Sequence, residues 1–246
     1  MPASDVPLPL DLDLPRQLQR EPSLRERERK YLVDRRTALG FWAAVSAQPR
    51  LHAPHGKSPV YVRTTYFDTA DFAYYRGTAG PVSRRIRVRE YASAGPDGIP
   101  LLNGICVLEL KQSALGRRSK TRVGVAPDEV ADQLARFGGP PLTPCLTTWY
   151  RRAALTDRAE RMRLTLDARI RFCAPTPVGA PCDGIEPAEI LAAGPAFVLE
   201  VKLWDEPPAW LARALQGLDE AVGYSKFMAG MQAAEARGLL CPQTDY

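Results

Sequence analysis

The chain has 246 residues, of which 45% are hydrophobic and 25% are charged, with a formal net charge of +5 and an isoelectric point near 9.0. This length allows one large domain or two small ones, and the hydrophobic share excludes a chain too polar to form a packed core. The mild basic excess indicates an anionic partner only if the basic residues are clustered, and otherwise a solvated basic surface.

Cysteine and histidine content predicts neither a zinc site nor a disulfide framework. The cysteines are odd in number, widely spaced and without a CxxC pair, which favours a reducing compartment. His52 and His55 lie in a segment with proline and lack nearby cysteine or carboxylate partners, so we interpret them as loop residues. The cysteines are Cys106, Cys145, Cys173, Cys182 and Cys241.

The N-terminal segment shows no secretion signal, because prolines and acidic residues interrupt it. Residues 1–23 are rich in proline and have no periodicity, so we expect a flexible tail. The most apolar stretch, Ala38 to Ala47, has ten residues and is too short to span a bilayer. The sequence therefore predicts a soluble, cytoplasmic protein with no membrane partner.

The first half of the chain alternates predicted strands with short helices. A strand over 24–32 is followed by a helix that Asp34 can cap and that extends to about Gln48. The apolar side chains of this helix recur at the spacing of one helical face, which is typical of core packing. They are Ala38, Phe41, Trp42 and Val45. The further elements are a loop over 50–59, a strand over 60–67, a helical turn over 69–76, and strands over 83–91, 105–112 and 120–125.

In the second half, strands come first and helices close the chain. Pro127 suits the first turn of a helix that extends to Phe137 and ends at Gly138 and Gly139. The later elements are strands over 146–155, 161–172 and 197–203, a loop over 174–187, and helices over 208–222 and 226–237. The fold class is α+β, with about eight mostly antiparallel strands in one domain over 24–240. This number of strands is enough to close an eight-stranded β-barrel with helices packed outside.

Most of the predicted strands alternate ionic with apolar residues. Because successive side chains of a strand point to opposite faces, Arg85, Arg87, Arg89 and Tyr91 share one face in the stretch from 85 to 91. The other charged faces are Glu26, Glu28 and Lys30; Glu109 and Lys111; Lys120 and Arg122; Tyr150 and Arg152; Arg161, Arg163, Thr165, Asp167, Arg169 and Arg171; and Glu200 and Lys202.

Taken singly, each of these strands is typical of a sheet with one wet face. The set is unusual because its polar faces are almost wholly ionic and because Glu-x-Lys recurs three times, at 28–30, 109–111 and 200–202. If the sheet closes with these faces inward, the interior is a basic tunnel. Roughly a dozen facing cations require an anion in a partly dehydrated space.

A chain of phosphates suits such a tunnel. Arginine offers paired donors that match phosphate oxygens, and lysine offers a mobile point charge. The carboxylates then either orient the cations or hold a divalent metal, because Mg²⁺ and Mn²⁺ commonly bind one or two carboxylates together with phosphate oxygens.

Several motifs of the sequence resemble known families. Glu26-x-Glu28-x-Lys30 is similar to the ExExK signature of the triphosphate tunnel metalloenzymes, the CYTH group. The motifs YFDT at 66–69, RIRVREY at 85–91, LELK at 108–111, LEVK at 199–202 and SKF at 225–227 resemble the VTC domain. This is the polyphosphate polymerase domain of the vacuolar transporter chaperone complex. The resemblance covers about residues 24 to 232.

The resemblance implies an antiparallel tunnel fold in which the γ-phosphate of ATP is transferred to a growing polyphosphate chain. Together with the charged faces, it implies a metal site for Mn²⁺ or Mg²⁺ at Glu200, with Glu26, Glu28 and Glu109 as supports or second ligands. The implied catalytic residues are Lys30, Arg87, Arg89, Arg152 and Lys226. The implied substrate-binding residues are Arg76, Arg85, Lys111, Lys120, Arg122, Tyr150, Arg169, Lys202 and Ser225.

Other activities would use the same face. A triphosphatase would need Glu26 or Glu28 to orient water, and an adenylate cyclase would release pyrophosphate. A non-catalytic module would bind polyphosphate without turnover. Nucleic acid is the weakest alternative, because the basic residues alternate on strands instead of clustering on a helix. In the family a basic residue often precedes the Ser-Lys pair by two or three positions, where this sequence has Gly223 and Val222. The oligomeric state is not indicated.

Overall fold

The computed structural model describes residues 27–240 apart from 55, 57–58, 81–82, 96, 115–116, 137–138, 185 and 188. The predicted tail over 1–23, the beginning of the first predicted strand, Glu26, His55 and Cys241 lie outside the described residues.

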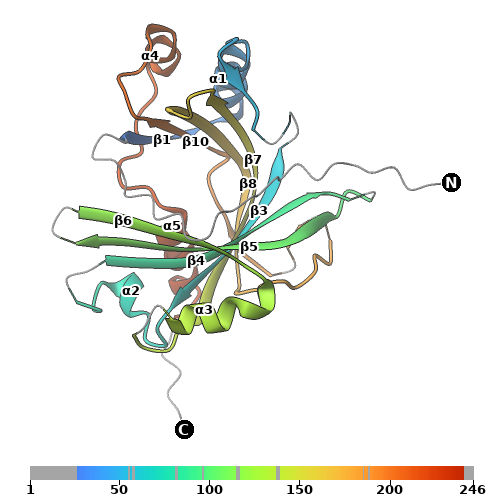
Figure 1. Cartoon of the computed structure of the whole chain (residues 1–246), viewed down its shortest axis with the longest axis vertical. Helices are drawn as coiled ribbons and strands as arrows, with labels where there is room; N and C mark the ends of the chain where they lie inside the picture. The colour runs from blue at the N-terminus through green and yellow to red at the C-terminus, as the bar shows by residue number, and fades with distance from the viewer. Residues whose placement is uncertain are drawn as a thin grey trace.

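Within the described residues, ten antiparallel strands form one sheet (Figure 1). From one edge to the other, the eight main strands are β1 (Arg27–Val33), β10 (Phe197–Leu203), β8 (Met162–Cys173), β7 (Thr143–Asp157), β3 (Val60–Asp68), β4 (Ser83–Ala94), β5 (Pro100–Ala114) and β6 (Arg117–Val125). Two short strands lie off this path: β2 (Leu51–His52) pairs with β7, and β9 (Ile190–Ala193) pairs with β8.

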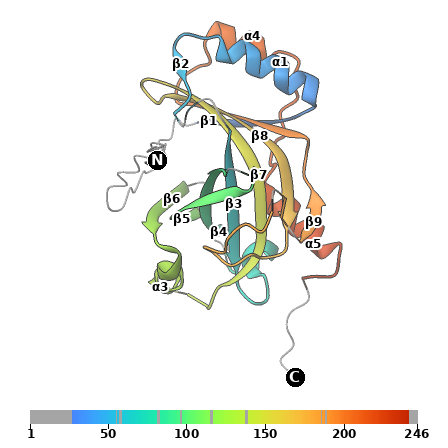
Figure 2. The same ribbon diagram turned by 90° about the vertical axis from the view of Figure 1, so that its right-hand side faces the viewer.

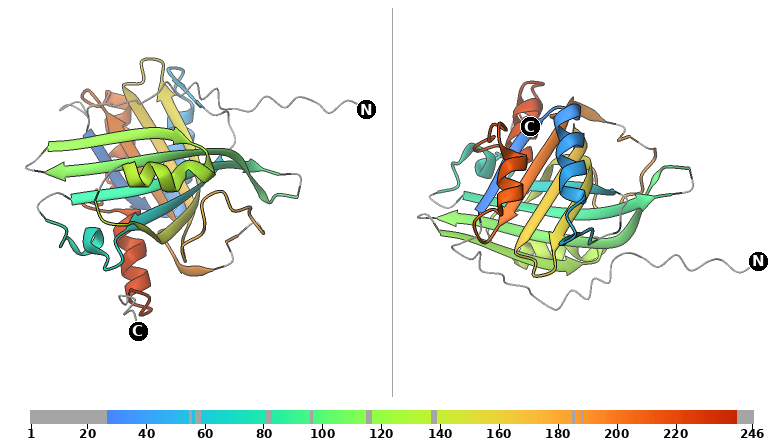
Figure 3. Two further views of the ribbon diagram at one scale, coloured as in Figure 1. Left: turned by 60° about the horizontal axis from the view of Figure 1, so that its bottom comes forward. Right: turned by 90° about the horizontal axis from the view of Figure 1, so that it is seen from above.

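The predicted closure into a barrel is wrong, because β1 and β6 are the two edges of the sheet and no described pairing joins them. Residues 220–221 cover part of the β1 edge: Tyr31 forms an isolated bridge with Glu220, and the Ala221 amide donates to the Lys30 carbonyl at 2.7 Å. The sheet instead bends back over itself. Figure 1 shows the limb of β4, β5 and β6, teal to green, below β1 and β10, and Figure 3 shows it crossing the limb of β1, β10 and β8.

The helices are short. They are α1 (Arg35–Ser46), α2 (Ala73–Arg76), the 3-10 turn η1 (Pro127–Glu129), α3 (Val130–Arg136), α4 (Ala209–Leu215) and α5 (Lys226–Glu235). Asp34 caps α1 as predicted, since its carboxylate accepts from the Thr37 amide at 2.8 Å. The helix predicted over 208–222 ends earlier, at Leu215, because Gln216 is extended and Gly217 has a φ of 80°. No helix in the described part of the chain is long and apolar enough to cross a bilayer.

Helices cover the apolar side of both limbs (Figure 2). On one limb, α1 and α4 pack through residues such as Phe41 and Leu211 against the apolar side of β8 and β10. On the other limb, Val130 and Leu134 of α3 lie in one cluster with Val88 of β4. Because the apolar sides face outward to helices, the ionic sides of the two limbs face each other, as the sequence predicts.

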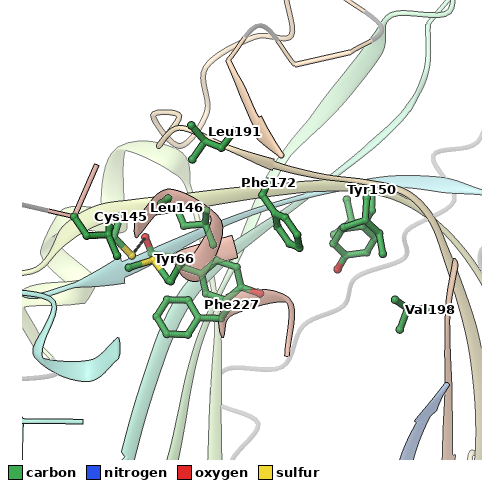
Figure 4. Packing of buried hydrophobic residues seen from close by; sticks show 13 residues of the cluster. Tyr66, Cys145, Leu146, Tyr150, Phe172, Leu191, Val198 and Phe227 are labelled. Carbon is green, nitrogen blue, oxygen red and sulfur yellow. Dashed lines mark hydrogen bonds between the residues drawn. The ribbon is translucent and has the colours of Figure 1, made fainter. Parts of the chain in front are cut away.

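The C-terminal helix α5 packs on the concave side of the sheet, where the strands present apolar residues. Phe227 lies 5.1 Å from Tyr66, measured between ring centroids, and belongs to one cluster with Leu146 and Phe172 (Figure 4). This packing holds the first residue of α5, Lys226, close to the charged residues of the sheet.

Candidate functional site

In the part of the chain that the structure describes, the facing sides of the two limbs hold fifteen ionisable side chains, eleven basic and four acidic, which we call the ionic cluster. They come from seven strands and from the first residue of α5. They are Glu28, Lys30, Arg85, Arg87, Arg89, Glu109, Lys111, Lys120, Arg122, Arg152, Arg163, Asp167, Glu200, Lys202 and Lys226.

Glu109 organises the cations of one limb. Its carboxylate is fully buried and contacts Arg87 on β4. It also accepts a hydrogen bond of 2.5 Å from Arg122 on β6 and lies 3.0 Å from the Nζ of Lys120 on the same strand. Burial raises the pKa of Glu109, but Arg87 and Arg89 outweigh burial and hold it well below its usual range. Glu109 therefore suits the orientation of cations and does not suit a metal, because its carboxylate is fully buried among four cations, whereas Glu28 and Glu200 are partly exposed.

Asp167 has the same role on the other limb. Its fully buried carboxylate accepts two hydrogen bonds from Arg152, at 2.6 and 2.7 Å, and one from Lys226 at 2.6 Å. Both cations also lie over the ring of Tyr150, at 5.2 and 4.8 Å from its centroid. Burial raises the pKa of Asp167, but Arg152 and Lys226 outweigh burial and hold the pKa below its ordinary value. The sequence places Asp167 on the charged face but indicates no role for it.

Glu28 and Glu200 form a pair of carboxylates on neighbouring strands. Lys202 lies between them, with its Nζ 2.9 Å from Glu28 and 3.6 Å from Glu200, and the Lys30 Nζ lies 2.9 Å from Glu28. Burial and Glu200 raise the pKa of Glu28, but Lys202 and Lys30 outweigh them and lower it to about 2. For Glu200, burial raises the pKa, while Lys202 and Arg152 hold it below its usual range. Both are therefore ionised at neutral pH.

This pair suits a divalent cation better than the other predicted ligands do. Two ionised carboxylates that share one lysine would bind Mg²⁺ or Mn²⁺ together with oxygens of a substrate. Among the described residues, no group of three or more histidine, cysteine, aspartate and glutamate side chains is placed to hold a metal by itself. A metal here would therefore depend on phosphate oxygens.

Electrostatic contacts between the limbs confirm that their ionic sides face each other. On β5, repulsion by Arg87 and then burial lower the pKa of Lys111 to about 7, while Glu28 on β1 raises it. On β6, burial lowers the pKa of Lys120 to about 6, partly offset by Glu109. On β8, burial and then Arg152 lower the pKa of Arg163, and Arg122 on β6 and Arg89 on β4 lower it from the other limb. Arg163 has no ion pair with any described residue. These cations lack full compensation. The sequence indicates no role for Arg163, although it lies on the predicted face.

Exposure falls from the edges of the sheet towards its middle. The Arg122 side chain, near the β6 edge, is 41% exposed, whereas Arg152, on the central strand β7, is 12% exposed. The edge strands therefore form a rim and the central strands form a floor.

Arg169 is not part of the ionic cluster, so the prediction that it shares a face with Asp167 is wrong. The β7–β8 register shifts between Trp149 and Arg151, and Arg169 has a φ of 53°. This bulge reverses the alternation. Arg169 and Arg171 therefore point away from the cluster, 3.8 and 3.3 Å from Glu186.

Two further predicted residues, Arg76 and Ser225, make contacts that the sequence does not predict. Arg76 is exposed and donates to the carbonyls of Asp71 and Leu240, at 3.0 and 3.1 Å, so it lies outside the ionic cluster. Ser225 caps α5, because its hydroxyl accepts from the Met228 amide at 3.5 Å. The observed contact of Ser225 therefore orients Lys226.

Other predicted residues lie on the ionic side of the sheet, and their roles in catalysis and binding stay predictions. Arg85, Arg87, Arg89, Lys111, Lys120, Arg122, Arg152, Lys202 and Lys226 belong to the ionic cluster, and Tyr150 lies buried beneath two of its cations. A pocket of about 450 Å³ lies elsewhere, between the outer side of β1 and α4. It is lined by Arg29, Tyr31 and Arg213 among others and contains none of the cluster residues.

Solved structures with a related arrangement of strands share little sequence with this chain. A candidate adenylate cyclase from Bacillus halodurans is 16% identical, with 89% of this chain and 92% of that chain covered and a TM-score of 0.41. A Pyrococcus horikoshii protein is 12% identical, with 84% and 98% covered and a TM-score of 0.48. A candidate adenylate cyclase from Vibrio parahaemolyticus is 12% identical, with 87% of each chain covered and a TM-score of 0.41.

These structural similarities are too distant to support an argument about activity. No curated protein matches the chain. The family model of the VTC domain, in contrast, matches residues 25–139 and 135–235. These residues include all described strands and all of α5. Because this match extends over most of its length, the chain belongs to the VTC domain family.

Proposed function

We propose that this chain is a metal-dependent polyphosphate polymerase, which transfers the γ-phosphate of ATP to the end of a polyphosphate chain bound at the ionic cluster. Membership of the VTC domain family supports this proposal. The observation on which it depends most is the excess of eleven basic side chains over four carboxylates among the described residues of the two facing limbs, which a linear polyanion would neutralise.

The two buried carboxylates prepare the cations for phosphate. Glu109 and Asp167 fix Arg87, Arg122 and Arg152 in defined orientations, so little conformational freedom remains to be lost on binding. Arginine side chains held in this way offer donors to adjacent phosphate oxygens. Lys111, near the middle of the cluster, would become fully charged beside the polyanion.

Glu200 and Glu28 are the residues that would hold Mn²⁺ or Mg²⁺. When bound, the metal would neutralise charge on the phosphates of ATP. Arg87, Arg89 and Arg152 would neutralise the charge that develops on the transferred phosphoryl group. The attacking group is an oxygen at the end of the polyphosphate chain, which is already ionised at neutral pH, so the protein need not remove a proton from it.

Hydrolysis by a general base has less support. A carboxylate that activates water must accept a proton, and efficiency is greatest when its pKa lies near the working pH. The pKa of Glu28 is about 2 and that of Glu200 is also lowered, so both are weak bases. These environments suit transfer to an ionised phosphate better than transfer to water.

The proposal is tested by incubating the purified chain with ATP and Mn²⁺, or with Mg²⁺, and resolving the phosphorus-containing products by size. We expect ADP and long polyphosphate, and loss of both in Glu200→Gln. Release of orthophosphate alone would instead identify a triphosphatase, and pyrophosphate with a cyclic nucleotide would identify a cyclase. Tight polyphosphate binding without turnover under either metal would identify a non-catalytic module.

A further inference from the structure

Two pairs of threonines lie side by side on the central strands β3 and β7. Thr64 is the direct cross-strand partner of Thr148, and Thr65 is the partner of Thr147. Because side chains alternate along a strand, the two pairs point to opposite faces of the sheet. Thr64 is also the partner of Arg89 on β4, so the Thr64 pair lies on the side of the ionic cluster.

The outer pair is fully hydrogen-bonded. The hydroxyls of Thr65 and Thr147 lie 3.4 Å apart, and Thr65 donates to the Thr176 carbonyl at 3.3 Å. The Thr147 hydroxyl also accepts from the Thr176 amide at 2.9 Å. This is the usual condition of buried hydroxyls in proteins.

The inner pair differs, although it is equally buried. Thr64 and Thr148 are both 0% exposed, and neither hydroxyl has a hydrogen-bond partner in the described structure. Arg89 is 6% exposed, and its Nε is likewise unpartnered. Across β7, β3 and β4, these residues form one row of three adjacent polar groups without partners.

The position of the row indicates which ligand would satisfy it. The row lies on the central strands, at the floor of the ionic face, where the polar groups are removed from solvent. Two hydroxyls and one N–H can all donate, and no described group offers them an acceptor. An anionic oxygen with several lone pairs would accept from all three. The hydroxyls would add donors at this point without adding further positive charge to the cluster.

We propose that Thr64 and Thr148, together with the Nε–H of Arg89, form a subsite that binds a phosphoryl oxygen of the polyphosphate chain. This inference rests on the proposed function and adds a neutral, dry set of donors beneath the cations. Hydrogen bonds to a charged oxygen are stronger in such surroundings than in water. Unsatisfied hydroxyls that are costly in the free protein would thus be satisfied in the complex.

The test uses Thr64→Val and Thr148→Val, which remove one hydroxyl at nearly constant volume. Thermal unfolding is measured with and without polyphosphate of defined length, and the dissociation constant is measured by calorimetry. We expect the melting temperature of the free protein to stay the same or to rise, because an unpaired buried hydroxyl is removed. We expect the dissociation constant to increase about tenfold, because a hydrogen bond to a charged group is lost. Thr64→Ser should restore the affinity of the wild type.

Thr65→Val and Thr147→Val are the matched controls on the other face. They break existing hydrogen bonds, so we expect a lower melting temperature of the free protein and an unchanged affinity for polyphosphate. Equal affinity of wild type, Thr64→Val and Thr148→Val would overturn the subsite and leave the proposed function intact. A lower melting temperature of the free inner variants would also overturn it, since it would indicate hydroxyls satisfied by a structural water. If the wild type does not bind polyphosphate, both proposals fail.

Discussion

At the scale of single residues, the site depends on two fully buried carboxylates that each hold several cations. Glu109 and Asp167 come from opposite limbs, and cations surround both. Removing one partner of such a buried ion pair lowers the stability of the protein, because the other partner is left as a desolvated charge. Their contribution to function is to fix the directions of the cations before substrate binds.

Asp167→Asn should therefore destabilise the protein strongly. Removal of the charge leaves Arg152 and Lys226 buried without the carboxylate that both contact, and we expect the free energy of unfolding to fall by about 3–5 kcal/mol. Urea denaturation measures this change. Because the two cations also lose their fixed orientation, affinity for polyphosphate should fall in the variant that remains folded.

Asp205→Asn is the matched control, since Asp205 pairs with Arg161 on the surface. Both of these side chains are largely exposed, so the same substitution should change the free energy of unfolding by less than about 1 kcal/mol. Equal effects of the two substitutions would contradict the role that we assign to Asp167.

The lysines of the cluster predict a pH dependence of binding. The pKa values of Lys120 and Lys111 are about 6 and about 7, below the ordinary value of 10.5. Between these values and 10.5, the folded free protein holds fewer protons than the unfolded chain, so stability rises with pH across this window. Bound phosphates raise both pKa values, so binding takes up protons.

Affinity for long polyphosphate should thus be highest below about pH 6 and should fall as the pH rises above about 7. Calorimetric titrations in buffers of different ionisation enthalpy measure the proton uptake directly. Lys120→Arg keeps its charge throughout this range and should take up fewer protons. Affinity that is independent of pH in the wild type would show that these lysines do not face the ligand.

At the scale of elements, α5 is positioned by the absence of one side chain. A Cβ on Gly230 would lie 2.5 Å from Cδ2 of Leu146 and 2.9 Å from Cδ1 of Phe172, so the helix could not keep its present distance from the sheet. The same helix holds Lys226 against Asp167, which links its packing to the ionic cluster.

Gly230→Ala should lower the free energy of unfolding by about 1–3 kcal/mol, because overpacking outweighs the gain in helix propensity. It should also weaken polyphosphate binding through displacement of Lys226. In α1, Gly40 is exposed, and a Cβ there would meet nothing within 4 Å. Gly40→Ala should thus stabilise the protein by about 0.5–1 kcal/mol. Thermal denaturation of the two variants compares these effects, and stabilisation by both would contradict tight packing of α5.

Strand alternation was sufficient to identify most of the ionic cluster from the sequence, because a regular strand separates its side chains into two faces. It failed at Arg169, where a bulge between paired strands reverses the alternation. A bulge depends on how two strands pair, and no local pattern near Arg169 indicates it. The alternation also places Asp167 on the charged face. Its contacts with Arg152 and Lys226 could not be predicted, because the three residues lie on three separate elements, β8, β7 and α5.

At the scale of the whole molecule, the sequence predicts the orientation of the sheet but not its closure. Charges on one side of each strand and apolar residues on the other required helices outside, and α1, α3 and α4 occupy these places. Closure depends on pairing between the first and last strands in the sheet, β1 and β6, which strand count cannot establish. The segment at 220–221 pairs with part of the β1 edge instead.

The central claim is that a linear polyanion binds between the two limbs, and one pair of arginines tests it most directly. Arg122 lies in the ionic cluster and Arg169 lies on the opposite side of the sheet, and both are accessible to solvent. The measurement is the dissociation constant for polyphosphate of Arg122→Gln and of Arg169→Gln, at one fixed salt concentration. We predict an increase of about tenfold for Arg122→Gln and no change for Arg169→Gln. Equal losses in the two variants, or a larger loss in Arg169→Gln, would contradict binding between the limbs.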